Sequence, residues 1–102
     1  MIEKPSVNCI SEADLVSIIV RILTQLGGKA AKACVVELIY NECHEAFDHP
    51  YYQEAVSGGI PRWRHYIAWA KEQAKHSGLI KRPIQSGYGI WELTDQARQD
   101  AA

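Results

Sequence analysis

The fold of this chain is decided by residues 61–94, which read PRWRHYIAWAKEQAKHSGLIKRPIQSGYGIWELT. Pro61 suits the first position of a helix, where no backbone N–H donor is needed, and Gly78 is typical of the position just after a helix. Between them, apolar residues recur with the 3.6-residue period of a helix, which predicts a helix over residues 61–77. Its core-facing side carries Trp63, Tyr66, Ile67, Ala70, Ala74 and Ser77.

The rest of this stretch predicts a β-hairpin. Two runs of β-forming residues, 79–82 and 90–94, are separated by a glycine-containing loop over 83–89. In the second run apolar side chains alternate with Glu92, so one face of that strand is expected to be buried. A short closing helix is expected to begin at Thr94-Asp95 and to continue through Gln99.

Two further helices are predicted upstream. The first begins at Ser11, which forms a variant of the capping box with Asp14, and ends at Gly27-Gly28. Its apolar stripe consists of Leu15, Ile18, Ile19, Ile22, Leu23 and Leu26. A second stripe, ending before Pro50, consists of Val35, Leu38, Ile39, Cys43 and Ala46 or Phe47. Residues 48–60 are expected to be a loop.

The order of these elements indicates a mainly α fold with a small β-hairpin. Three helices, a hairpin and a closing helix are the plan of a winged helix-turn-helix, with a three-helix core, a wing and a short C-terminal helix. The expected domain covers residues 11–99, with an N-terminal extension over 1–10 and a C-terminal tail over 100–102. A chain of 102 residues with 47% hydrophobic content is expected to form one core.

Composition restricts the cellular setting. No apolar run is long enough to cross a membrane, and the first residues lack the layout of a signal peptide. The three cysteines form no CxxC pair and leave one thiol unmatched under any pairing. A reduced compartment is therefore expected, and with it a cytoplasmic protein with no membrane partner.

The charges of the chain are unevenly distributed, although its net charge is only −1. Residues 1–60 carry four lysines and arginines against eight acidic residues, whereas residues 61–85 carry six against one. A basic segment on one helix and the following turn can bind phosphates locally. The alternative is a solvated helix face that only keeps the protein soluble.

A set of residues in the second half also resembles a known family. The set comprises Ser57-Gly58-Gly59, Trp63, Trp69-Ala70, Lys75, Gly78-Leu79-Ile80, Arg82-Pro83, Gly89, Trp91 and Leu93-Thr94. It resembles the N-terminal winged-helix domain of Mrr-type restriction endonucleases, which cut foreign, modified DNA, and the resemblance is best over residues 57–97. It implies a target-recognition or modification-recognition module of a restriction system. That family is expected to have a basic residue just before the Trp-Ala pair, where this chain has Tyr66, and the nuclease domain of such enzymes has no counterpart here.

Double-stranded DNA is therefore the predicted partner, and the resemblance implies a nuclease domain or partner protein beside it. The predicted contact residues lie on the third helix and the hairpin: Arg62, Arg64, His65, Lys71, Lys75, Lys81, Arg82, Gln85 and Tyr88. Arg64, Lys71 and Lys75 share a stripe with the small Ala68, which would let this face approach a groove closely. No catalytic residue, metal or cofactor is predicted, so the chain itself is not expected to be an enzyme.

Other interpretations remain open at this point. Winged helices also serve as protein-interaction adaptors, and the partner surface would then comprise Glu37, Glu42, Glu45 and the Tyr51-Tyr52 loop. Cys43-His44 with His49 would suit zinc, but a fourth ligand is missing and Cys43 fits the apolar stripe.

The tryptophans also allow two interpretations. Trp63, Tyr66 and Trp91 fit core positions, although aromatic side chains can also cage a base. Trp69, at the edge of the core-facing sector, is expected to pack against the first helix or the hairpin.

Overall fold

The computed structural model describes residues 2–101 and is mainly helical, with a small antiparallel sheet, as predicted. The longer elements are α1 (Glu12–Gln25), α2 (Lys32–Phe47), α4 (Arg62–His76) and α6 (Asp95–Ala101). The shorter ones are β1 (Lys29–Ala31), α3 (Pro50–Gln53), a 3₁₀ turn (Ser57–Gly59), α5 (Pro83–Ser86) and β2 (Ile90–Glu92). None of the helices in these residues is both long and apolar enough to span a bilayer.

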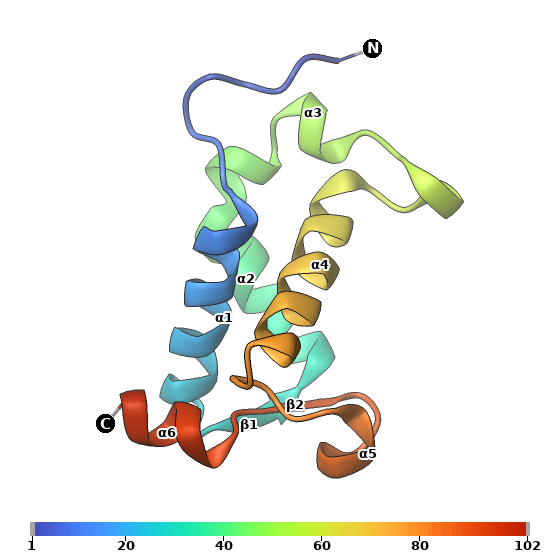
Figure 1. Ribbon diagram of the computed structural model, residues 1–102. Coiled ribbons are helices and arrows are strands. Elements are labelled where there is room, and N and C mark those ends of the chain that lie inside the picture. Colours follow the sequence, from blue (N-terminus) through green and yellow to red (C-terminus); the bar gives the residue numbers. More distant parts are fainter. Residues whose placement is uncertain (1, 102) are drawn as a thin grey trace.

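Helix α1 packs against both α2 and α4. The predicted capping box is present, because Ser11 Oγ accepts from the Asp14 backbone N–H and the Asp14 carboxylate accepts from the Ser11 N–H, each at 3.1 Å. The stripe of α1 that contains Leu15 and Ile19 is fully buried. It packs against both α2 and α4, which lie to the right of α1 in Figure 1, with α2 behind.

The sheet differs from the predicted hairpin. Strand β2 pairs along its length with β1, in the register Lys29↔Glu92, Ala30↔Trp91 and Ala31↔Ile90. The predicted pairing with residues 79–82 is limited to one bridge, Ile80↔Leu93, on the other side of β2. Since β1 and β2 come from opposite ends of the chain, the apolar pattern of residues 79–94 could not reveal this pairing.

Two predicted loops contain helical turns. Within residues 48–60, Pro50 starts α3, and His49 Nδ1 caps it by accepting from the Tyr51 N–H at 3.0 Å. The Tyr52 side chain of α3 is fully buried, and its hydroxyl oxygen accepts from the Ile10 N–H at 3.1 Å. This side chain orders the segment 48–60 and ties the N-terminal extension to the core. The second predicted loop, residues 83–89, contains the helical turn α5.

The predicted bounds of two helices also need correction. Pro61 is the residue that caps α4, not its first helical residue. Helix α6 continues through Ala101, two residues into the predicted tail, and Ala102 lies outside the described residues. Both differences are of the one or two residues by which helix ends commonly vary.

Aromatic side chains join the three segments α2, α3 and α4. The ring centroids of Phe47 and Tyr52 are 5.5 Å apart, and those of Tyr52 and Tyr66 are 5.3 Å apart. The ring centroids of Trp63 and Tyr40 are 4.7 Å apart. Trp63 and Tyr66 are both partly buried against the core, so the core placement predicted for them is confirmed. The placement predicted for Trp69 is wrong, because 56% of its surface is exposed.

Trp91 is expected to be essential for stability. Its side chain is 5% exposed in the middle of β2, so Trp91→Ala removes buried surface and leaves a cavity, which should cost about 3–5 kcal/mol. Urea unfolding followed by circular dichroism measures this loss. Trp69→Ala is the matched control and should change the free energy of unfolding by no more than about 0.5 kcal/mol. Equal losses in the two variants would contradict the burial described here.

Candidate nucleic-acid interface

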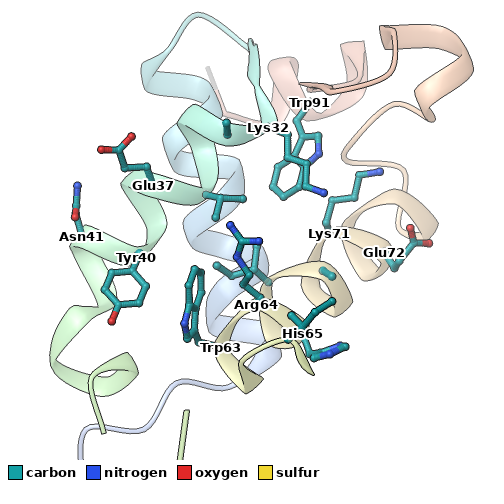
Figure 2. Close-up of a pocket in the computed structure, with 15 residues that line it drawn as sticks. Lys32, Glu37, Tyr40, Asn41, Trp63, Arg64, His65, Lys71, Glu72 and Trp91 are labelled. Carbon is teal, nitrogen blue, oxygen red and sulfur yellow. The ribbon is translucent and has the colours of Figure 1, made fainter. Parts of the chain in front are cut away.

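A groove between α2 and α4 holds part of the predicted basic stripe. Its cavity volume is about 780 Å³, and Figure 2 shows the side chains that line it. The walls are mostly apolar and aromatic, with Val36, Tyr40, Trp63, Ile67, Ala68 and Trp91. Arg64 and Lys71 of α4 line the same groove, so the stripe borders a hollow surface instead of a flat helix face.

Three cations face this groove without an acidic partner. Arg64 is exposed, with its guanidinium carbon 5.4 Å from the centre of the Trp63 ring. Lys71 is half-buried, and the loss of hydration there lowers the pKa of its ammonium group. Lys32, the first residue of α2, extends toward Lys71 (Figure 2). Within residues 2–99, none of the three has a carboxylate at ion-pair distance.

Arg62 has a structural role. Its guanidinium contacts the Glu54 carboxylate at 2.9 Å, donates to the Tyr51 carbonyl at 2.9 Å and lies 4.1 Å from the centre of the Tyr51 ring. These contacts fasten α3 and the residue that follows it to the first turn of α4. Arg62 was predicted to contact DNA, but its charge is already paired with the Glu54 carboxylate.

Two other predicted residues of α4 are also engaged. Lys75 Nζ lies 2.8 Å from the Glu72 carboxylate, and the hydrogen bond from Lys75 lowers the pKa of Glu72. His65 Nε2 lies 3.1 Å from the carbonyl oxygen of Ser57, which joins α4 to the 3₁₀ turn. Both side chains are therefore less free than Arg64.

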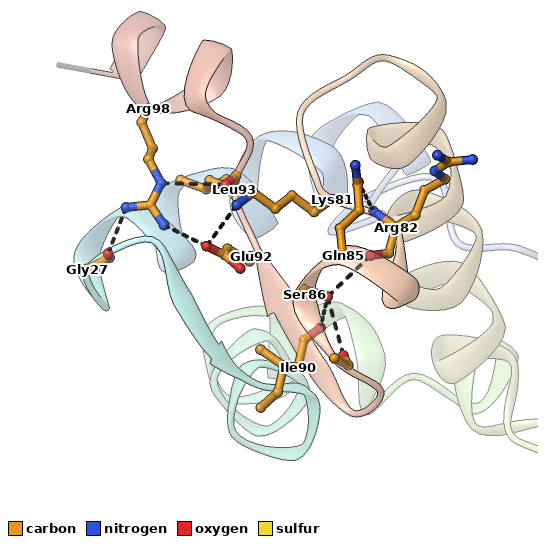
Figure 3. A network of polar contacts seen from close by, with 10 residues as sticks. Gly27, Lys81, Arg82, Gln85, Ser86, Ile90, Glu92, Leu93 and Arg98 are labelled. Atoms are coloured by element: carbon orange, nitrogen blue, oxygen red, sulfur yellow. Dashed lines mark hydrogen bonds and ion pairs between the residues drawn. The ribbon is translucent and has the colours of Figure 1, made fainter.

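In the segment after α4, some polar side chains are likewise bound within the protein, and others are exposed (Figure 3). Lys81 Nζ lies 3.1 Å from the Glu92 carboxylate, and Arg98 contacts the same carboxylate oxygen at 3.3 Å. Gln85 accepts from the Arg82 backbone N–H at 3.2 Å and so stabilises the turn of α5. By contrast, the Arg82 side chain is exposed and has no ion-pair partner within residues 2–99, and Tyr88 is 85% exposed.

Sequence reasoning missed two features of this surface. Lys32 was not predicted as a site residue, because only the packing of α2 beside α4 brings it to the groove. Trp69 was expected to pack against the first helix or the hairpin, and the exposure of Ile84 on α5, which is 79% exposed, was not predicted. Their local sequence gives no sign of this exposure.

The structure weakens the case for the zinc site and for the protein-adaptor surface. Cys43 is buried, which raises its thiol pKa to about 11, and no cluster of three or more histidine, cysteine or acidic residues suited to a metal occurs in the described part of the chain. In the surface suggested for a protein adaptor, Tyr52 is fully buried and Glu42 forms an ion pair with Arg21. Glu37 and Glu45 remain exposed.

Glu92 is expected to stabilise the protein only while it is ionised. Its pKa is lowered, chiefly by the hydrogen bond from Lys81, so its contribution is present above the ordinary carboxyl value of 4.5 and is lost as pH falls further. Glu92→Gln should lower the free energy of unfolding at pH 7 by up to about 1 kcal/mol. The difference from wild type should shrink as the pH falls through the lowered pKa of Glu92. Urea titrations at several pH values test this, with Glu45→Gln as the exposed control, and a difference that does not change with pH would contradict it.

Known proteins give no direct guidance on this surface. Comparisons with protein-family models, curated proteins and solved structures found no match to the chain.

Proposed function

We propose that this chain is a winged helix-turn-helix domain that binds double-stranded DNA. In this proposal α4 enters the major groove, and the segment 82–89 contacts the neighbouring phosphate backbone. The resemblance over residues 57–97 favours a target-recognition or modification-recognition module of a Mrr-type restriction system, working beside a nuclease domain or partner protein. No catalytic step is assigned to the chain itself.

The topology supports the winged-helix part of this proposal. Strand β1 follows α1, and helices α2, α3 and α4 follow β1. The chain then returns to the sheet, where β2 pairs with β1 and the bridge Ile80↔Leu93 lies on the other side. The segment 82–89 lies between Ile80 and β2, at the end of the molecule that carries the sheet (Figure 1). A segment in this position corresponds to the wing of the proposed fold.

The observation that carries the proposal is the separation of paired from unpaired cations. Arg62, Lys75 and Lys81 are bound to carboxylates, whereas Arg64, Lys71 and Arg82 have no such partner within residues 2–99. A cation that is already neutralised gains little from a phosphate, while an unpaired one can replace the counterions of DNA. The unpaired cations occur on the proposed recognition helix and wing, where phosphate contacts are expected.

Replacing the unpaired cations is expected to weaken DNA binding. Arg82→Ala should lower affinity similarly for unrelated duplexes and reduce the slope of log affinity against log salt by about 0.9, the value for one phosphate contact. Arg64→Ala should weaken binding and also alter sequence preference if its side chain reaches the bases. Fluorescence anisotropy with two unrelated duplexes across a salt series measures both effects.

The matched control is Arg21→Ala, which removes one positive charge from α1, where Arg21 is paired with Glu42. This variant should leave the salt slope unchanged. Lys81→Ala should have a smaller effect than Arg82→Ala, because Glu92 already holds Lys81. If the wild type shows no salt-dependent duplex binding, the adaptor interpretation replaces this proposal.

A further inference from the structure

The groove between α2 and α4 is larger than phosphate contacts require. Phosphates can be held by exposed cations alone, yet this open groove has a volume of about 780 Å³ and is lined by apolar side chains of both helices. Volumes of about 300–1,000 Å³ are typical of sites for small molecules. We propose that the groove binds a small aromatic carboxylate, with its ring between the aromatic walls and its anionic group beside Lys32, Arg64 and Lys71.

The aromatic walls determine the flat, apolar part of the ligand. Trp63 and Tyr40 pack edge to face, with centroids 4.7 Å apart, at one part of the groove, and Trp91 lines another (Figure 2). Ile67 and Ala68 of α4 also line the groove. The exposed Ala68 leaves room beside α4, so a flat ring can approach the helix closely and contact aromatic faces and edges.

The charges around the groove determine the anionic part. Lys32 and Arg64 extend into the same space as Lys71 in Figure 2. Burial is the main cause that lowers the pKa of Lys71, and the like charges of Lys75 and Lys32 lower it further, whereas the Glu72 carboxylate acts in the opposite direction. A carboxylate between these groups would relieve the repulsion and provide a charged hydrogen-bond acceptor in a partly dehydrated position.

Of the acidic residues that line the groove, Glu72 offsets part of the positive charge at Lys71. The Glu72 carboxylate is held by Lys75 at 2.8 Å. Glu37 is exposed and points away from Arg64 and Lys71 in Figure 2. The part of the groove that joins Trp91 to Trp63 is therefore bordered by unpaired positive charges, and a neutral or cationic aromatic ligand would lack a partner for them.

The three tryptophans provide a built-in test. Trp63 and Trp91 line the groove, whereas Trp69 does not, so their indole N–H signals in a ¹H–¹⁵N spectrum report binding with an internal reference. The probe is 1-naphthaleneacetate, compared with the neutral 2-(1-naphthyl)ethanol and the cationic 1-naphthylmethylamine. The carboxylate should shift the signals of Trp63 and Trp91 saturably while that of Trp69 stays in place. The neutral probe should bind about ten-fold more weakly, and the cation more weakly still.

The role of the charged rim is tested by substitution. Lys71→Met keeps an unbranched side chain of similar size and removes its charge, and it should weaken binding of 1-naphthaleneacetate about ten-fold. Lys29→Met is the matched control: Lys29 is exposed, does not line the groove, and its loss should leave binding unchanged. Equal binding of the three probes, equal effects of the two substitutions, or no shift of the Trp63 and Trp91 signals would overturn the proposal. All measurements are made without nucleic acid, so their outcome is independent of DNA binding.

Discussion

The apolar stripe of α1 is the constraint on which the rest of the structure depends. Helices α2 and α4 both pack against it, and they meet each other through aromatic side chains such as Tyr40 and Trp63. The groove lies between these two helices and is lined by residues of both.

Local signals explain why the long helices could be predicted. The capping pair Ser11–Asp14 and the 3.6-residue period identify α1, and the period between Pro61 and Gly78 identifies α4. Strand β1 has no such signal, because Lys29-Ala30-Ala31 becomes a strand only by pairing with β2. Helix α3 is a single turn ordered by the burial of Tyr52, which no periodic pattern can indicate.

The candidate site could be predicted only at the level of residue type. Sequence identifies Arg62 and Arg64 as equally basic, but the fold brings Glu54 to Arg62 and leaves Arg64 unpaired among the described residues. Likewise, Lys81 meets Glu92 across the bridge Ile80↔Leu93, whereas nothing in the linear order indicates that Lys32 would join Lys71. Which charges remain available is decided by tertiary contacts, and these are invisible in a charge count.

The pairing of β1 with β2 also has a consequence for the order of folding. Helices α1, α2 and α4 are continuous stretches of sequence, while the sheet requires residues 29–31 to find residues 90–92. Closing so long a loop costs conformational entropy before any strand contact compensates for it, and such non-local pairings slow folding. During synthesis β1 has no strand partner until β2 has been made. We therefore expect the three-helix core to form before the sheet and before the contacts of Arg98 and Lys81 with Glu92.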